Sequence, residues 1–309
     1  MKENDFRLPA QDGTPLFVRA FLPAQKPRAI VQIAHGLAEH SARYARLAHA
    51  LTDHGFGVYA NDHRGHGYTA QRPEDLGFFA ERNGWTKVVG DQRTLLQEVN
   101  SRHPDTPVFL LGHSMGSYIA RGFALRHGKE LAGLLLSGTT HAGLWSFLQV
   151  QLLAKLERLR VGKRGRSRIV KSFTIDPLNL RFRNPRTDVD WLSRDEAEVD
   201  KYVADPLCGF DVTNQMWHDV MGGLMEICSE ANIARMPKDL PIYIFAGERD
   251  PLNDRLSAIR AFHMALDRAG MKSVTLRAYQ GARHELFNET NRDEVTHDVI
   301  EWLEQQLSC

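Results

Sequence analysis

The 309-residue sequence predicts an α/β fold: a mostly parallel central sheet with helices on both faces and an inserted helical cap. Three observations lead to this prediction. Short apolar runs rich in β-branched or aromatic residues, typical of buried strands, recur along the chain. Stretches of helical period lie between most of them, and a repeated order of strand then helix indicates a parallel sheet covered on both faces. Between residues 139 and 238 this alternation stops, and only helical patterns occur.

The expected sheet has six internal strands and an N-terminal hairpin. The six apolar runs are Ala29–Ala34, Gly57–Ala60, Val108–Leu111, Gly133–Ser137, Ile242–Ala246 and Ser273–Ala278. Two further segments, residues 6–8 and 16–21, flank the turn-like sequence Gln11-Asp12-Gly13. We expect these two segments to form a hairpin at an antiparallel edge of the sheet.

Helical periodicity predicts the elements that cover the sheet. The five stretches are Tyr44–Asp53, Trp85–Arg102, Met115–His127, Leu256–Ala269 and Arg292–Leu307. The domain organisation follows from this order of elements. We expect residues 1–138 and 239–309 to form one core, interrupted by a helical cap over residues 139–238.

Composition narrows the classes of function. The chain is 42% hydrophobic and 25% charged, which is ordinary for a soluble globular protein. It has 39 Lys plus Arg against 38 Asp plus Glu, so no global field draws it to nucleic acid. The cysteines Cys208, Cys228 and Cys309 have no metal-ligand spacing and indicate no disulfide framework. Without a signal segment or a run of about 18 apolar residues, the sequence predicts a cytoplasmic protein.

The expected cap has two unusual segments. His141 to Leu159 carries too many apolar residues for one narrow stripe facing a core. Lys155 to Lys171 then has eight basic residues against the single acid Glu157. Two interpretations of this basic tract stay open: a solvated helix end and loop, or a surface that contacts anionic lipid. The tract has no interleaved aromatic residues, which disfavours nucleic acid.

The sequence Gly112-His113-Ser114-Met115-Gly116 directly follows a predicted strand and precedes a predicted helix. This context turns a G-x-S-x-G string into a nucleophile elbow, a sharp turn that presents the serine at its tip. Glycines two residues before and after the serine let neighbouring chain pass without Cβ clashes. We therefore interpret Ser114 as the nucleophile.

A serine hydroxyl needs a base and an orienting carboxylate, which follow the serine in the chain order of this fold. Asp250 follows the predicted strand Ile242–Ala246, and His284 lies in the loop after the strand Ser273–Ala278. We assign Asp250 as the acid and His284 as the base. The alternatives for the acid are Glu248 and Asp254, the latter at an expected helix start. His263 and His297 fall within helical patterns and are interpreted as surface or packing residues.

The reaction also needs donors for an oxyanion. One should be the backbone N–H of Met115, and the other should be the N–H of Leu37 in the loop after the strand Ala29–Ala34. His35 is either a turn residue or a side chain that braces this loop. His35, His40, His63 and His66 cluster in the sequence but have no metal-ligand spacing, so no metal is predicted.

Six motifs in order resemble the monoacylglycerol lipase and lysophospholipase family of α/β-hydrolases, a serine aminopeptidase S33-like group. They are HGLAEHSARY (35–44), NDHRGHG (61–67), LLGHSMGS (110–117), VDKYVADPL (199–207), GERDPL (247–252) and GARHEL (281–286). The resemblance covers about residues 29–307. It implies the α/β-hydrolase fold, the same triad and oxyanion donors, and a helical cap over an apolar acyl channel.

The resemblance also implies residues for substrate binding. Glu39 and Arg43 occupy the family positions near a glycerol head group, and His113 beside the serine is expected to line the same site. The sequence has Ala38 where the family usually has glycine, preceded by the bulky Leu37. We expect this departure to narrow the head-group end.

The leading hypothesis is a serine ester hydrolase that cleaves a fatty acyl ester, monoacylglycerol or lysophospholipid, through an acyl-enzyme and without cofactor. A second hypothesis keeps the triad and makes the substrate a peptide or amide, whose amine would need an acidic anchor. Cap residues available for this anchor are Asp188, Asp190, Asp195 and Glu196. The third hypothesis is a non-catalytic binding protein on the same fold.

Overall fold

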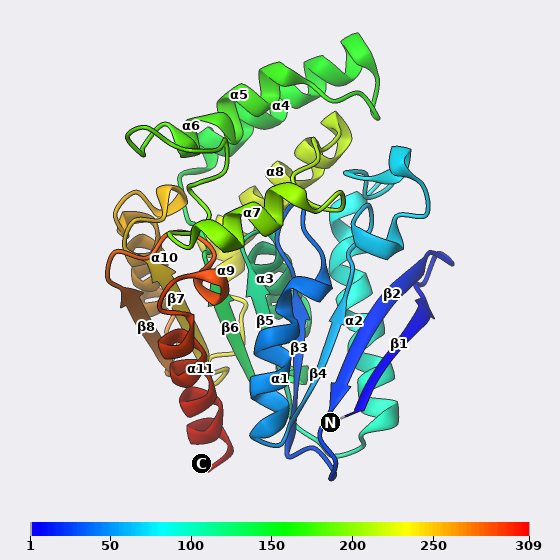
Figure 1. Cartoon of the computed structure of the whole chain (residues 1–309), viewed down its shortest axis with the longest axis vertical. Coiled ribbons are helices and arrows are strands. Elements are labelled where there is room, and N and C mark those ends of the chain that lie inside the picture. Colours follow the sequence, from blue (N-terminus) through cyan, green and yellow to red (C-terminus); the bar gives the residue numbers. More distant parts are fainter. Residues whose placement is uncertain (1, 309) are drawn as a thin grey trace.

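The chain forms one eight-stranded sheet in the order β1-β2-β4-β3-β5-β6-β7-β8, seen in a computed structural model that describes residues 2–308 (Figure 1). β1 (Lys2–Pro9) and β2 (Pro15–Leu22) make an antiparallel hairpin, and β2 also runs antiparallel to β4. All remaining neighbours are parallel. The predicted hairpin edge and mostly parallel sheet are confirmed.

The parallel strands lie where the apolar runs predict them. They are β3 (Ala29–Ala34), β4 (Phe56–Asn61), β5 (Val108–His113), β6 (Gly133–Ser137), β7 (Ile242–Gly247) and β8 (Val274–Tyr279). Every residue of β3 to β7 is buried, because helices cover both faces of these strands. β8 is an edge strand, and most of its residues are partly or fully exposed.

Helices divide between the two faces of the sheet. α1 (Ala45–Asp53) and α11 (Arg292–Leu307) pack on one face, where their apolar residues form one cluster with alternate residues of the strands. α2 (Gly84–Arg102), α3 (Met115–His127) and α10 (Ser257–Arg268) belong to the cluster on the other face. The strand residues alternate between the clusters because side chains of a strand point to opposite faces.

The start of α10 differs by one residue from the prediction of a helix from Leu256. A short 3₁₀ turn at Pro251–Asn253 is followed by three residues with positive φ, namely 41° at Asp254, 54° at Arg255 and 71° at Leu256. An α-helix of L-residues cannot include left-handed backbone, so the helix begins at Ser257. Asp254 is therefore not the N-cap residue suggested by its position in the sequence.

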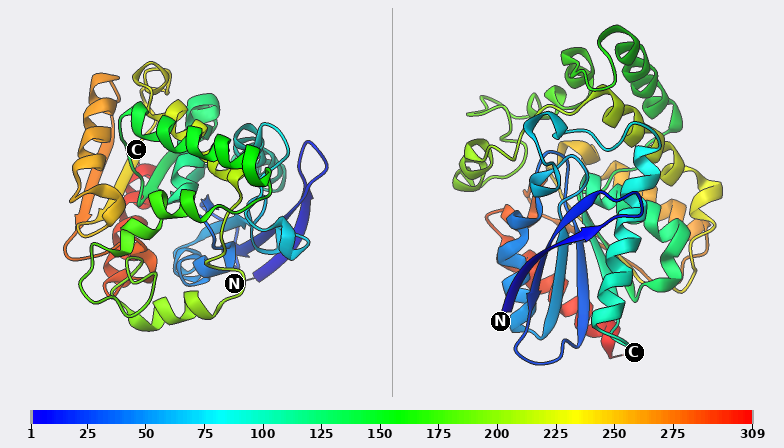
Figure 2. Two further views of the ribbon diagram at one scale, coloured as in Figure 1. Left: turned by 90° about the horizontal axis from the view of Figure 1, so that it is seen from above. Right: turned by 90° about the vertical axis from the view of Figure 1, so that its right-hand side faces the viewer.

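Between β6 and β7 the described chain forms helices and no strand, as predicted for the inserted cap. The helices are α4 (Leu144–Val161), α5 (Arg168–Thr174), α6 (Asp176–Asn179), α7 (Glu196–Ala204), α8 (Asn214–Cys228) and α9 (Glu230–Ile233). Figures 1 and 2 show α4 to α7 over one end of the sheet. α8 packs against α4 and also against α2 and α3, so it joins the cap helices to the core. The expected boundaries at residues 138 and 239 stay a prediction.

The cap covers the carboxyl ends of the parallel strands, which is where open α/β sheets bind ligands. The loops after β3, β5, β7 and β8 all begin at this end of the sheet. These loops carry the residues singled out by their sequence motifs. No helix within residues 2–308 has both the length and the apolar character needed to span a bilayer.

Candidate active site

Ser114 occupies the sharp turn between β5, which ends at His113, and α3, which begins at Met115. Its φ of 51° and ψ of −120° are strained for a residue with a side chain, and its N–H donates to Ser137 O at 2.9 Å. A Cβ on Gly116 would lie 1.9 Å from Ala34 O, and one on Gly112 would lie 2.4 Å from Gly116 O. Both positions therefore require glycine, as the elbow interpretation expects.

Asp250 and His284 come together from the loops after β7 and β8. His284 Nδ1 donates to Asp250 Oδ2 at 2.8 Å, and both side chains are almost fully buried. Asp250 also accepts from the side-chain amide of Asn253 at 2.8 Å and from the backbone N–H of Leu252 at 2.9 Å. These bonds hold the carboxylate in one orientation, so the Nδ1 proton of His284 is fixed as well.

The other acids and histidines weighed from the sequence lie elsewhere. Glu248 accepts from the N–H of Gly281, and Asp254 forms an exposed ion pair with Arg181 at 2.8 Å. His263 pairs with Asp267 on α10, and His297 is exposed on α11. Within the described chain, Asp250 is the acid that meets His284 in a hydrogen bond.

The environment of His284 shifts its basicity in two opposed ways. Burial lowers the pKa of His284, but the charge and hydrogen bond of Asp250 outweigh burial, so the pKa is raised above its ordinary value. Nε2 of His284 is buried and makes no hydrogen bond within residues 2–308. Ser114 and His284 line the same cavity. Hydrogen bonds between catalytic groups are often long without substrate and shorten when substrate binds.

The loop after β3 places Leu37 beside the same cavity, together with Met115. Met115 is the first residue of α3, so its N–H has no partner within the helix. His35 braces this loop: its Nε2 accepts from His63 N at 2.9 Å, so its Nδ1 carries the proton and donates to Gly36 O at 2.8 Å. In a trans peptide the next N–H, that of Leu37, points opposite to this carbonyl.

Ala38 has an unfavourable backbone conformation at the position where the family usually has glycine. Its φ is 52°, in the left-handed region. Its carbonyl accepts from Gly209 N at 2.9 Å and from Tyr202 Oη at 3.1 Å, both from the cap. The cap thus holds this strained residue next to Leu37. Ala38 lines the cavity, and whether it narrows the head-group end stays a prediction.

A buried ion-pair network lies behind the cavity and joins two loops. Arg43 donates to Glu39 at 2.7 Å and forms a two-pronged pair with Glu285 at 2.5 and 2.6 Å. Glu39 also accepts from Gly36 N at 2.5 Å. Burial raises the pKa of Glu285, but the charge and hydrogen bonds of Arg43 outweigh this effect and lower it to about 2. Glu285 was not singled out from the sequence, although it lies inside the motif GARHEL.

The three residues expected to bind substrate lie in different places relative to the cavity. Glu39 lines the main cavity, but both of its carboxylate oxygens already accept hydrogen bonds from the protein. Arg43 is absent from the described lining of that cavity and lies behind it. His113 lines the cavity with its ring 4.8 Å from that of His284, and burial lowers its pKa to about 4, so it is neutral.

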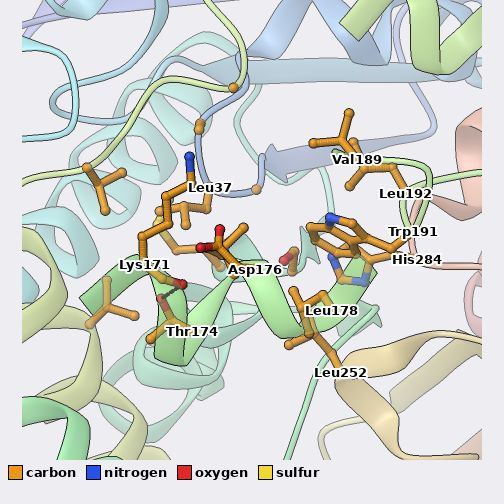
Figure 3. A pocket seen from close by; sticks show the side chains of 18 of the residues that line it. Leu37, Lys171, Thr174, Asp176, Leu178, Val189, Trp191, Leu192, Leu252 and His284 are labelled. Atoms are coloured by element: carbon orange, nitrogen blue, oxygen red, sulfur yellow. Dashed lines mark hydrogen bonds between the residues drawn. The ribbon is translucent and has the colours of Figure 1, made fainter. Parts of the chain in front are cut away.

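A cavity of about 900 Å³ extends from Ser114 under the cap. Much of its wall is apolar and comes from α3, α4 and α8, and the residues there are Tyr118, Phe147, Val150, Trp217, Val220, Met221 and Leu224. Figure 3 shows Trp191, Leu192 and Leu178 around His284, with Lys171, Thr174 and Asp176 on the opposite side near Leu37. Trp191 carries no sequence signal that would have assigned it to the site.

The four histidines that cluster in the sequence fall into two groups in the structure. His35, His63 and His66 are neutral because burial lowers their pKa values, to about 3 for His63 and about 4 for His66. His40 Nε2 lies 2.9 Å from Asp205 Oδ2, with the Cys208 thiol nearby. Burial strongly raises the pKa of Cys208, which disfavours the thiolate that a metal needs. Cys208 and Cys228 are free thiols, and Cys309 lies outside the described residues.

Known proteins similar to this chain include serine hydrolases and esterases. Residues 25–291 match the family described as serine aminopeptidase, S33. The chain is 30% identical to the monoacylglycerol lipase of Mycolicibacterium smegmatis, over 96% of this chain and 95% of that protein. It is 30% identical to the human monoglyceride lipase, over 96% and 89%. A thermostable carboxyl esterase from Bacillus coagulans, solved in complex with glycerol, superposes with a TM-score of 0.92 at 30% identity, covering 99% of each chain.

The elbow geometry leads to the first prediction. Ser114→Ala should lower kcat for ester hydrolysis by about a millionfold, because the hydroxyl is the assigned nucleophile. The strained turn does not depend on the hydroxyl, so the melting temperature should stay within about 2 °C. Steady-state kinetics and thermal unfolding test both statements. A variant that keeps a tenth of wild-type kcat would remove Ser114 from the reaction.

The Asp250–His284 pair leads to the second prediction. His284 must be neutral to act as a base, so kcat/KM should rise with pH through one ionisation with a midpoint above the ordinary imidazole pKa of about 6.5. Asp250→Asn should lower kcat by roughly 10⁴. It should also move the midpoint to lower pH, because burial then acts without the opposing carboxylate. A flat profile for the wild type from pH 5 to 8 would contradict the assignment of His284.

Proposed function

The chain belongs to the serine aminopeptidase S33 family of α/β-hydrolases, as a monoacylglycerol-lipase-like serine hydrolase, and from this we propose that it cleaves fatty acyl esters through an acyl-enzyme. The observation that carries the proposal is the single cavity that holds Ser114, His284, Leu37 and Met115 in its wall. A long apolar wall continues from these residues beneath the cap. An acyl chain fits such a wall, whereas a polar peptide would leave its amides unpaired there.

The proposed reaction uses only side chains and backbone groups of this chain. Ser114 Oγ attacks the ester carbonyl carbon while Nε2 of His284 takes its proton, and Asp250 stabilises the imidazolium. The N–H groups of Leu37 and Met115 bind the oxyanion. The C–O bond to the alcohol then breaks, and His284 returns the proton to the leaving alcohol. Water, activated by the same histidine, hydrolyses the acyl-serine and releases the fatty acid.

The amide hypothesis gains support from the family name but little from the site. Of the four acids available as an amine anchor, only Asp188 is in the described lining of the cavity. Asp190 accepts hydrogen bonds from residues 186 and 187, and Asp195 caps α7 and pairs with Arg292 at 2.7 Å. Glu196 is largely exposed. The non-catalytic hypothesis is disfavoured because the strained elbow and the paired acid and histidine are all present.

The outer surface of the cap supports contact with lipid. Between Leu144 and Leu159, six apolar residues of α4 are exposed, with two more on α5 and one just after α6: Leu144, Trp145, Leu148, Leu152, Leu156, Leu159, Ile169, Phe173 and Leu180. We name these nine residues the apolar face. Such a large exposed apolar surface is unusual on a soluble protein. It lies above the cavity that would receive the acyl chain, so we propose that it docks on a lipid aggregate.

The contacts of the basic tract bear on its two open interpretations. Arg160 pairs with Glu157 at 2.7 Å, and Arg164 pairs with Asp75 at 3.2 Å. Arg166 donates to the carbonyl of Leu76 at 3.0 Å. These charges are partly neutralised within the chain, which favours the interpretation of the tract as a solvated helix end and loop. Docking on lipid would then depend on the apolar face more than on charge.

A substrate panel tests the proposed function. The panel contains p-nitrophenyl esters from C2 to C16, monoacylglycerol and lysophosphatidylcholine. Their turnover is measured beside that of aminoacyl anilides. Medium or long acyl esters should give kcat/KM at least 100-fold above the anilides, because the apolar wall binds the acyl chain. Ser114→Ala should be inactive on every substrate. A preference for the anilides would contradict the ester proposal and support the amide hypothesis.

The apolar face leads to a further prediction. Replacing Trp145, Leu159 and Phe173 together by Ser should weaken binding to phosphatidylcholine vesicles containing phosphatidylglycerol by at least tenfold, about 1.4 kcal/mol. Hydrolysis of soluble p-nitrophenyl butyrate should stay within about twofold, because the assigned triad is untouched. Co-sedimentation at low and high salt measures the binding.

Two control variants accompany this experiment. Met264→Ser removes an exposed apolar residue on α10, outside the apolar face, and should leave vesicle binding unchanged. The combined replacement of Arg158, Arg160, Arg164 and Arg166 by Ser tests the basic tract, and we expect a smaller loss with this variant. A larger loss with the arginine variant would contradict docking by the apolar face and restore the electrostatic interpretation.

A further inference from the structure

We propose that Trp191, a residue of the cap, is a positioning residue that holds the imidazole of His284. The inference rests on the proposed function, in which His284 is the base. It adds that the cap supplies part of the support for the base as well as covering the cavity. The residue acts through His284 and forms no bond to the substrate.

The backbone of the cap runs alongside the loop that carries His284. His284 N donates to Trp191 O at 3.4 Å, and Glu285 N donates to Leu192 O at 2.7 Å. Ser193 Oγ donates to Asn288 O at 2.8 Å, at the far end of the same loop. Residues 191–193 therefore hold the histidine loop at His284, at the next residue and at Asn288, by two main-chain bonds and one bond from the Ser193 hydroxyl.

A buried carboxylate fastens the two segments together. Glu289 is fully buried and accepts from the N–H of Arg283 at 2.7 Å. It also accepts from the backbone and the side chain of Arg194, at 3.1 and 2.8 Å. Hydrogen bonds to a buried charge are stronger than those between neutral groups, so the position of Trp191 relative to His284 is well determined.

The rings complete the enclosure of the base. The Trp191 ring lies 4.9 Å from that of His284, and the His113 ring lies 4.8 Å from it. Asp250 holds the Nδ1 edge. Figure 3 shows the indole directly beside the imidazole. With these contacts the imidazole is restrained, and its Nε2 edge carries no hydrogen bond within the described chain.

The indole nitrogen indicates that the ring, and not its N–H, is what matters here. Trp191 is 7% exposed, and its Nε1 is buried without a hydrogen-bond partner among residues 2–308. A buried donor without an acceptor is unfavourable for folding. Phenylalanine would keep an aromatic ring against His284 and remove this unpaired donor. Trp191→Phe should therefore fold as well as the wild type.

The kinetic test compares two variants of Trp191 on a soluble p-nitrophenyl ester. Trp191→Leu should lower kcat 10- to 100-fold with KM within about threefold, because a base displaced by about 1 Å costs roughly 100-fold. Trp191→Phe should keep kcat within about threefold of the wild type. An equal loss with Phe and Leu would overturn the proposal, since the indole N–H would then be the group that matters.

Trp217 provides a matched control. It is 6% exposed, lines the same cavity from α8 and has no described ring contact with His284. Trp217→Leu should raise KM with kcat within about threefold, because it removes part of the acyl wall. If Trp191→Leu behaves in the same way, Trp191 is a wall residue only and the proposal is overturned.

A spectroscopic readout separates this inference from the proposed function. Protonated imidazole quenches a neighbouring indole, so the fluorescence of the wild type should rise as His284 loses its proton with increasing pH. The charged and titratable groups around His284 are Asp250, Glu285, Glu39 and His113. The transition should disappear in Trp191→Phe and in His284→Gln. It requires no turnover, so an inactive wild type would defeat the proposed function alone, whereas a transition unchanged in Trp191→Phe would overturn the positioning role.

Discussion

The close approach of α3 to β3 is the constraint on which the rest of the site depends. Gly116 lies so near the Ala34 carbonyl that no side chain fits between them. This contact brings the first turn of α3 against the end of β3, and with it the loop that contains Leu37. The strain at Ser114 is maintained because β5, β6 and α3 are all held by the sheet. The candidate nucleophile and both candidate oxyanion donors are therefore positioned by the same contact between α3 and β3.

Buried polar networks link the loops that carry the other groups. Arg43 connects Glu39, in the loop with the candidate oxyanion donor Leu37, with Glu285, next to His284. His35 orients the peptide that precedes Leu37. Buried ion pairs contribute little net stability, because the cost of desolvation offsets their attraction. Their value here is geometric: they hold two loops from opposite parts of the chain at one end of the sheet.

The cap performs different tasks on its two sides. Its outer side presents the apolar face, and its inner side contributes Phe147, Trp217 and Trp191 to the wall of the cavity. The segment around Trp191 also pairs with the loop that carries His284, so a movement of this segment would displace that histidine. In the proposed function, substrate entry and the alignment of His284 would thus both involve the cap, through different parts of it.

The sequence by itself determined the order of strands and helices in the core and the helical insertion, and it predicted roles for Ser114, Asp250 and His284. These features rest on local patterns: apolar runs, helical period and turn motifs whose chemistry is confined to a few neighbouring residues. Only the tertiary structure decided that Arg43 lies behind the cavity, that Asp188 alone of four acids reaches its described wall, and that Trp191 meets His284. Trp191 and His284 are far apart in the sequence, as are Arg43 and Glu285, so no local pattern predicts that they touch. Such contacts form only when folding brings distant segments of the chain together.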